Sequence, residues 1–287
     1  MRKESAQATA KQTTEEVGNS QIGNSHIDST QVVNLQRDSS TGNSPIGNTE
    51  EYANTTTGLS ILPAAGIGEV TAGCDLADLI VQHCHLEDFD VLVVTQKVVS
   101  KAEGRVVGID PTDPDAKRKL VESESRRILR RRGDLIISET YHGFVCASAG
   151  VDLSNIEEGY AVLLPIDPDR SARRIRDRIK AINGKQVGVI ISDTFGRTWR
   201  TGLTDIAIGC AGIAAIVDLK GTTDANGRIL NATEVCIVDE LASAAELVMG
   251  KSSGIPAAII RGLPHTIFRD SSVKEEVIRH PSGDLFR

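Results

Sequence analysis

The densest group of polar side chains that could carry out chemistry lies between Ser192 and Asp205. It follows an apolar run that ends at Ile191, so Asp193 is expected at the carboxyl end of a strand, where α/β proteins bind ligands. The neighbouring carboxylate and hydroxyl groups of Asp193 and Thr194 suit a hard cation such as Mg²⁺, which prefers oxygen ligands. A polar turn in which Asp193 caps a helix would use the same residues, and the spacing alone favours neither interpretation.

A second acidic segment, with Asp152 and Asn155, also follows an apolar run, Phe144–Ala147. Asp152 could share one metal ion with Asp193, and the Asn155 amide could contact a nucleotide or another substrate. The same residues are typical of a turn in which a side-chain oxygen accepts a hydrogen bond from the backbone. Taken alone, this segment favours the turn.

Two lysines, Lys97 and Lys101, follow the apolar run Asp90–Thr95. They are four residues apart, so a helical turn would place both ammonium groups on one side. Such a pair could neutralise a polyphosphate. A solvated basic patch is the commoner alternative.

Two glycine-containing segments depart from phosphate-binding motifs. Gly66 and Gly68 match the first two glycines of G-x-G-x-x-G, but Thr71 stands where the third is required. Gly250–Ser252 matches the end of a Walker A loop, but a helix is expected before it and Ala245 stands at the first glycine position. We therefore predict neither a Rossmann dinucleotide site nor a P-loop.

The elements that must position these groups are short β-branched runs that alternate with amphipathic stretches. The strands are expected at Leu59–Leu62, Asp90–Thr95, Leu135–Ser138, Gly143–Ala147, Ala161–Leu164, Val187–Ser192, Val235–Val238 and Ala257–Arg261. The helices are expected at Leu76–Cys84, Pro114–Arg132, Arg170–Ala181 and Glu240–Met249. No regular βαβ period is present, so the pattern predicts a mixed α/β (α+β) fold rather than a doubly wound parallel sheet.

The basic run Arg126–Arg132 is expected on a solvated helix face, with Glu122 one turn before Arg126 to pair with it.

The overall charge argues against a nucleic-acid binder. The 287 residues include 32 Lys and Arg against 39 Asp and Glu, for a formal net charge of −7. Apolar runs fall far short of the ~20 residues that span a bilayer, and the first residues contain no apolar signal segment. The five cysteines are widely spaced and lack C-x-x-C, which favours reduced thiols over a disulfide framework or a zinc site. We expect a cytoplasmic protein that acts on neither membrane nor nucleic acid.

Residues 1–57 differ in composition from the rest, since Ser, Thr, Asn, Gln and Gly supply more than half of them. Too few apolar residues are present to offset the entropy of ordering. We predict a low-complexity, disordered tail over 1–57 and a folded domain over 58–287.

Five segments occur in one order that resembles the coenzyme F420-0:L-glutamate ligase family (the F420 γ-glutamyl ligases). They are Asp90–Arg105, Ala149–Asn155, Leu164–Ala172, Ser192–Arg200 and Asp239–Ala242. The resemblance implies GTP-dependent ligation of L-glutamate to coenzyme F420-0 through a γ-glutamyl amide bond, by way of an acyl phosphate. It also implies an intertwined homodimer with Mg²⁺ or Mn²⁺ at two sites, and it allows a K⁺ requirement.

The same resemblance implies roles for individual residues. Asp152 and Asp193 match ligands of the first metal ion, and Thr194 matches a ligand of the second. The positions that match GTP contacts are Ile67, Gly68, Glu69, Val70, Gln96, Lys101 and Asn155, together with the loop Met249, Gly250, Lys251, Ser252, Ser253, Gly254 and Ile255. Lys251 stands where some members place a carboxylate ligand, which leaves the coordination of the second metal open. No side chain is assigned as nucleophile or general base.

Two other functions remain open from the residues. A metal-dependent phosphotransferase or phosphohydrolase could use the same pair, Asp152 and Asp193, on another substrate. A non-catalytic nucleotide- or F420-binding subunit could keep the scaffold without turnover.

Overall fold

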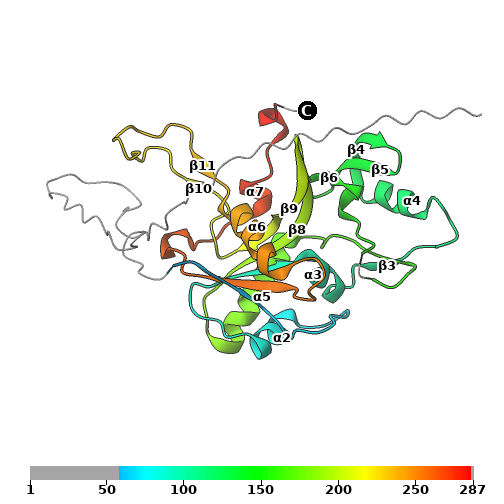
Figure 1. Ribbon diagram of the computed structural model, residues 1–287, viewed down its shortest axis with the longest axis horizontal. Helices are drawn as coiled ribbons and strands as arrows, with labels where there is room; N and C mark the ends of the chain where they lie inside the picture. Colours follow the sequence, from blue (N-terminus) through cyan, green and yellow to red (C-terminus); the bar gives the residue numbers. More distant parts are fainter. Residues whose placement is uncertain (1–57, 155, 286–287) are drawn as a thin grey trace, which may run out of the picture. The chain divides into compact units, whose positions relative to one another are not determined.

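A five-stranded sheet forms the centre of the computed structural model, which describes residues 58–154 and 156–285. In spatial order its strands are β1 (Ser60–Pro63), β12 (Ala257–Arg261), β2 (Val91–Thr95), β8 (Gly188–Arg197) and β9 (Arg200–Ala211) (Figure 1). β2 and β8 run parallel, and the other neighbours pair antiparallel. With the helices described below, this confirms the predicted mixed α/β class. The predicted tail 1–57 lies outside the described residues.

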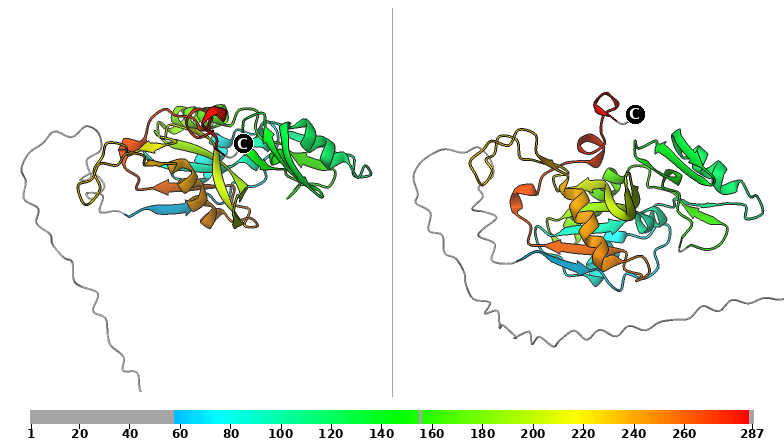
Figure 2. Two further views of the ribbon diagram at one scale, coloured as in Figure 1. Left: turned by 90° about the horizontal axis from the view of Figure 1, so that it is seen from above. Right: turned by 45° about the horizontal axis from the view of Figure 1, so that its top comes forward.

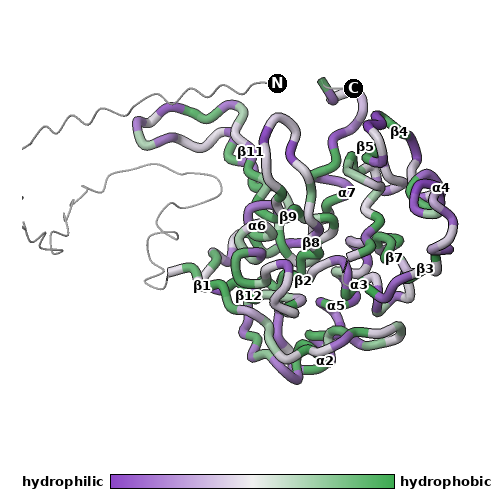
Figure 3. The backbone as a smooth tube through the Cα atoms, turned by 45° about the vertical axis from the view of Figure 1, so that its right-hand side comes forward, coloured by the Kyte–Doolittle hydropathy of each residue, from purple (hydrophilic) through white to green (hydrophobic). Residues whose placement is uncertain are grey.

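Both faces of the sheet are covered by helices. α5 (Pro168–Asn183) and α2 (Leu76–His83) lie on one face, and α6 (Ile237–Met249) lies on the other (Figure 2). Consecutive residues of β2 and β8 are therefore buried rather than alternately exposed, as expected for a strand covered on both sides. Figure 3 shows the apolar residues concentrated in this sheet.

Local sequence signals begin the helices that pack on the sheet. Asp167 caps α5 by accepting a hydrogen bond from the Arg170 N–H at 2.9 Å, and Pro168 occupies the first turn. Asp75 caps α2 in the same way, through the N–H groups of Ala77 and Asp78. α3 (Gln96–Ala102) begins directly at the end of β2 and was not among the predicted helices, although the spacing of Lys97 and Lys101 had raised a helical turn there as an alternative.

A second group of elements lies beside the central sheet (Figure 1). It comprises β3 (Val106–Gly108), α4 (Ala116–Ser123), β4 (Ser125–Arg132), β5 (Leu135–Thr140), β6 (Val145–Ala147), the 3-10 turn η1 (Ser148–Gly150) and β7 (Tyr160–Val162). β4, β5 and β6 form a three-stranded sheet, and β3 pairs with β7. A separate small apolar cluster that includes Val121, Ile136 and Leu163 packs this group together.

The remaining elements are short. They are β10 (Val217–Asp218), β11 (Glu234–Val235), the 3-10 turns η2 (His265–Ile267) and η3 (Pro281–Gly283), and α7 (Val273–Glu276). In the part of the chain that the structure describes, no helix has the length and apolar character needed to cross a bilayer. The five cysteines are free thiols, as predicted.

The predicted helix over Pro114–Arg132 is wrong in its second half. The helix ends at Ser123, and Ser125–Arg132 forms strand β4, which pairs with β5 through a two-residue turn at Gly133 and Asp134. Arg126 therefore does not pair with Glu122 along a helix. It lies near Glu139 of β5, and Glu122 contacts Arg131 at 2.8 Å.

Two further differences concern the second half of the chain. The strand predicted at Val235–Val238 is reduced to β11, because α6 already begins at Ile237. The long strand β9 was not predicted, although it forms an edge of the central sheet and carries part of the site. The other predicted strands and helices are present with shifted ends, and β12 has the predicted bounds.

Candidate active site

The parallel strands β2 and β8 reach one edge of the sheet together, and two predicted site residues follow at that edge. Thr95 and Ser192 are partners in the register of the two strands. Gln96 is the first residue after β2, and Asp193 is the first residue of β8 beyond the pairing with β2. Asp193 does not end its strand, however, because β8 continues to Arg197 in a hairpin with β9.

The hairpin brings into the site the carboxylate of Asp205, to which the sequence analysis assigned no role. Thr194 faces Asp205 in the register of β8 and β9. The Thr194 hydroxyl donates a hydrogen bond to Asp205 Oδ1 at 2.7 Å, and the Ser192 hydroxyl donates to Oδ2 at 3.3 Å. The Asp205 side chain is only 3% exposed. Asp205 could have been found from the sequence only if strand β9 had been recognised. In the β8–β9 hairpin, Asp205 and Asp193 lie at nearly the same distance along the chain from the connecting turn.

Asp193 lies among like charges. Burial raises the pKa of its carboxyl group to about 7, and the neighbouring carboxylates of Asp205 and Asp152 act in the same direction. A hydrogen bond from the Thr194 N–H at 2.8 Å opposes the shift. A cation beside Asp193 would favour its charged form. Carboxylates perturbed by burial and by neighbouring charges are typical of functional sites.

Asp152 lies in the second group of elements and is held from two sides. Its backbone forms an isolated bridge with Val162, and its Oδ1 accepts a hydrogen bond from the Ser154 N–H at 2.7 Å. Its Oδ2 lies 2.8 Å from Lys97 Nζ. Although burial opposes the effect, Lys97 and Ser154 lower the pKa of Asp152 below its ordinary value. The turn predicted for this segment is present, and the same turn brings Asp152 near Asp193.

Lys97 is not the solvated surface cation that the basic-patch interpretation describes. Its side chain is 19% exposed, and besides Asp152 it contacts the backbone oxygen of Ser154 at 2.8 Å. Lys97 and Lys101 do share one helix, α3, as their spacing predicted.

Lys101 lines a cavity of about 550 Å³ together with Glu69 and Val70. Its Nζ lies 2.6 Å from Glu69 Oε1. Ile67 and Val70 are buried and anchor the loop, whereas Gly68 adopts a φ of +73° that favours glycine. The structure thus brings together part of the predicted nucleotide-contacting set.

Of the predicted nucleotide contacts that the structure describes, Glu69, Val70 and Lys101 line this cavity, whereas Ile67, Gly68, Gln96 and the loop Met249–Ile255 do not. Gln96 is buried, and its Oε1 accepts a hydrogen bond from the Ser100 hydroxyl at 3.0 Å. Asn155 lies outside the described residues.

The predicted loop Met249–Ile255 follows α6 and reaches the β8–β9 hairpin through Lys251. The Lys251 ammonium lies 2.8 Å from Asp205 Oδ1 and 3.0 Å from Glu246 Oε1, and it also donates to the Thr194 hydroxyl. Although burial opposes the effect, the two carboxylates raise the pKa of Lys251. Glu246 is a second residue of this cluster that sequence reasoning missed.

Positive charges stand beside the carboxylates of this site. Across residues 58–154 and 156–285, no three His, Cys, Asp or Glu side chains form an arrangement that could by itself hold a metal ion. Lys97 contacts Asp152, and Lys251 contacts Asp205. The carboxylate of Asp193 accepts a hydrogen bond from the Thr194 backbone N–H.

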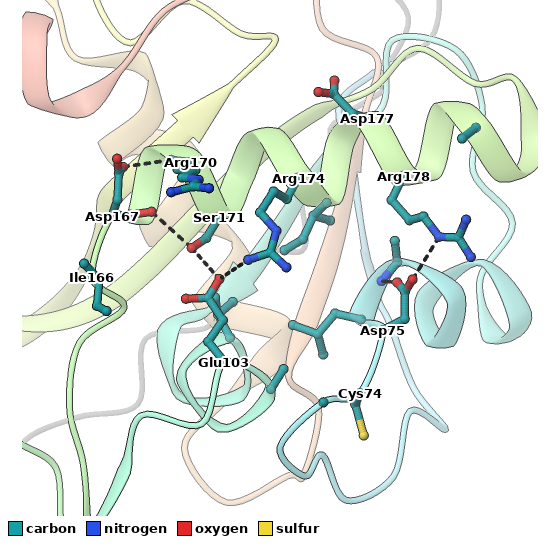
Figure 4. A pocket seen from close by; sticks show the side chains of 17 residues that line it. Cys74, Asp75, Glu103, Ile166, Asp167, Arg170, Ser171, Arg174, Asp177 and Arg178 are labelled. Carbon is teal, nitrogen blue, oxygen red and sulfur yellow. Dashed lines mark hydrogen bonds and ion pairs between the residues drawn. The ribbon is translucent and has the colours of Figure 1, made fainter.

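A second cavity, of about 950 Å³, lies between α2, α3 and α5 and contains none of the predicted site residues. Figure 4 shows Arg174 directed toward Glu103, at 3.7 Å, and Arg178 toward Asp75, at 2.8 Å. The Ser171 hydroxyl also donates to Glu103 at 2.7 Å. Because both arginines are paired with carboxylates that also line the cavity, their charges do not favour an anionic ligand there.

Comparison with known proteins agrees with the resemblance seen in the sequence. The family model described as F420-0:Gamma-glutamyl ligase matches residues 66–262. A protein of Methanothermobacter thermautotrophicus named coenzyme F420:L-glutamate ligase is 42% identical over 250 residues, which cover 80% of this chain and 99% of that protein. Proteins of the same name from Methanopyrus kandleri and Archaeoglobus fulgidus are 43% and 39% identical, over 80% of this chain and 98% and 96% of their own lengths. The chain belongs to the F420-0:gamma-glutamyl ligase family.

Proposed function

We propose that this chain joins L-glutamate to coenzyme F420-0 through a γ-glutamyl amide bond, with GTP as co-substrate. Family membership supports the proposal, because relatives that align over nearly their full length are named coenzyme F420:L-glutamate ligase. The observation that carries it is the gathering of Asp152, Asp193 and Asp205 near the start of α3, whose last turn carries Lys101 on the wall of a cavity.

The chemistry requires activation of a carboxylate, because a carboxylate oxygen is a poor leaving group. Transfer of the GTP γ-phosphoryl group to the carboxylate of F420-0 gives an acyl phosphate and GDP. The glutamate amine then attacks the carbonyl carbon, so that the C–N bond forms, the C–O bond to phosphate breaks and the nitrogen loses a proton. Phosphoryl transfer depends on positioning and charge neutralisation more than on a protein nucleophile. Accordingly, no nucleophile or base is assigned.

Asp152 and Asp193 are proposed to hold Mg²⁺ or Mn²⁺. Their carboxylate oxygens are the hard ligands that these ions prefer. The raised pKa of Asp193 supports this fit, because burial and the neighbouring carboxylates of Asp205 and Asp152 disfavour its charged form, which a bound cation would stabilise. A bound ion would neutralise phosphate charge during transfer. Lys97 and the Ser154 N–H hold the Asp152 carboxylate in position.

The nucleotide is proposed to bind in the cavity beside α3. Its lining includes Glu69, Val70 and Lys101. The remaining contacts proposed on the resemblance are Ile67, Gly68, Gln96, Asn155 and the loop Met249–Ile255. A homodimer and a K⁺ requirement are proposed on the same basis, and light scattering and replacement of K⁺ by Na⁺ would test them.

The experiment combines the purified chain with GTP, Mn²⁺, L-glutamate and F420-0 and follows the products by mass spectrometry. A product with the mass of F420-0 plus one glutamyl residue, formed in step with GDP and phosphate, would support the proposal. Phosphate release without the amide product would favour a phosphohydrolase or phosphotransferase. Nucleotide binding without turnover would favour a non-catalytic subunit. Reactions without glutamate serve as the control.

A further inference from the structure

Three elements converge on the ammonium group of Lys251. Thr194 comes from β8, Asp205 from β9 and Glu246 from the last turn of α6. The Lys251 Nζ lies 2.8 Å from Asp205 Oδ1 and 3.0 Å from Glu246 Oε1. Its third contact is the Thr194 hydroxyl, which in turn donates to Asp205. An ammonium has three donors, so these three oxygens use all of them.

The surroundings of Lys251 require a cation. Asp205 is nearly fully buried, and Glu246 is partly buried beside it. Two carboxylates that meet in a poorly solvated position repel each other unless a positive charge lies between them. The ammonium of Lys251 supplies that charge from within the chain.

The second metal ion implied by the family resemblance does not fit these residues. The resemblance gives Thr194 as one of its ligands, but the Thr194 hydroxyl already donates to Asp205 and accepts from Lys251. Lys251 itself stands where some members place a carboxylate ligand. A divalent ion at this position would lie against the positive charge of Lys251 rather than against a carboxylate.

We propose that the ammonium of Lys251 takes the place of a second metal ion, so that the oxygens of Thr194, Asp205 and Glu246 bind no metal in this chain. The inference rests on the proposed function, which supplies the first ion at Asp152 and Asp193. In this inference the Lys251 ammonium neutralises the carboxylates of Asp205 and Glu246, so that no metal ion is needed there.

Mn²⁺ stoichiometry, measured without nucleotide by isothermal titration and by electron paramagnetic resonance of free Mn²⁺, tests the inference. The variants are Lys251→Ala, which frees the three oxygens, and Lys251→Arg, which keeps the charge. Lys251→Ala is expected to bind one Mn²⁺ more per chain than the unaltered protein, whereas Lys251→Arg gains none. The matched control is Lys220→Ala, which also removes a lysine paired with two carboxylates, Asp218 and Glu234, at a different place on the chain.

The difference in bound Mn²⁺ between Lys251→Ala and the unaltered chain tests the role of Lys251. The number of Mn²⁺ ions that the unaltered chain binds tests the proposed first metal site. Equal Mn²⁺ binding by the unaltered chain and Lys251→Ala would overturn the role of Lys251. If the unaltered chain binds no Mn²⁺ at all, the proposed first metal site at Asp193 is refuted instead. The double variant Lys251→Ala with Asp205→Asn should lose the added ion, which locates it. If Lys251→Ala fails to fold, Lys251→Gln, which keeps most of the side-chain length, must show the same gain.

Discussion

Replacing Lys101 by alanine removes the ammonium group on the wall of the proposed nucleotide cavity. Its Nζ lies 2.6 Å from Glu69 Oε1, and the Lys101 side chain is 14% exposed against 76% for Glu69. The lysine is therefore the more buried partner of this ion pair. Because an ammonium has three donors, the contact with Glu69 leaves two for phosphate oxygens.

The size of the effect follows from the type of contact that is lost. A hydrogen bond to a charged group is worth about 1.5–3 kcal/mol, which corresponds to roughly 10- to 100-fold in affinity. Lys101→Ala should therefore raise the KM for GTP by that factor. It should lower kcat instead if the contact tightens only in the transition state. The KM for glutamate should stay within a few-fold.

Initial rates at varied GTP measure the change, and Lys185→Ala is the matched control. Lys185 is also a lysine paired with an acidic residue, Asp88 at 3.3 Å, but it does not line the cavity. Lys97→Ala cannot serve as this control because Lys97 contacts the proposed metal ligand Asp152.

Glu69→Gln separates the two roles that Lys101 could have. This variant keeps the ammonium but removes its charged partner. If it raises the KM for GTP as much as Lys101→Ala does, the lysine acts by holding Glu69 rather than by binding phosphate. An effect of Lys101→Ala confined to the KM for glutamate would also refute the reasoning and would place Lys101 at the amino-acid pocket.

Three further predictions concern Asp193 and the segment 1–57. Asp193→Asn should lower ligation by two orders of magnitude or more at saturating Mn²⁺ while leaving the circular dichroism spectrum unchanged, because a bound metal ion is worth several kcal/mol in such a transfer; undiminished turnover would remove Asp193 from the site. In the metal-free chain, the pKa of Asp193 rises from 3.8 to about 7 on folding, so the folded state binds more protons between these values and the free energy of unfolding should fall as pH rises through them. Urea unfolding across that range should show this slope, and Asp193→Asn should flatten it. Deleting residues 1–57 should leave kcat and the melting temperature nearly unchanged, because this segment has little apolar surface to bury; a large loss of either would show that the segment packs on the core.

The sheet could be predicted where burial on both faces gives continuous apolar runs. β2 and β12 were recognised because each reads as an uninterrupted apolar segment. β4 could not be recognised in this way, because its eight residues include five arginines and only two apolar residues. Its pairing with β5 and the ion pairs to Glu139 decide its conformation, and these lie outside any local pattern. The Gly133 and Asp134 turn was the one local signal of the hairpin.

The site could be predicted only in its separate parts. Asp193 and Asp152 were found because each follows an apolar strand. Asp205 lies inside β9, a strand that contains Gly202 and Gly209 and was not predicted. Its closeness to Thr194 depends on the register of the β8–β9 hairpin, including the shifts in that register. A single sequence does not fix such a register.

The spacing of Lys97 and Lys101 was sufficient to place both on one side of α3, but not to choose their partners. Lys97, at the start of the helix, contacts Asp152 from the second group of elements, and Lys101, one turn later, contacts Glu69 from the loop before α2. Both partners are distant in sequence, so neither contact follows from helical periodicity. Along the helix axis, the backbones of the two lysines are separated by a rise of about 6 Å. Lys97 uses its ammonium donors on Asp152 and Ser154, so Lys101 is the lysine of this pair that is proposed to meet the nucleotide. α3 therefore connects the proposed metal ligands to the proposed nucleotide cavity. Replacing Lys97 should affect the position of Asp152 at the proposed metal site, whereas replacing Lys101 should affect nucleotide binding in the cavity.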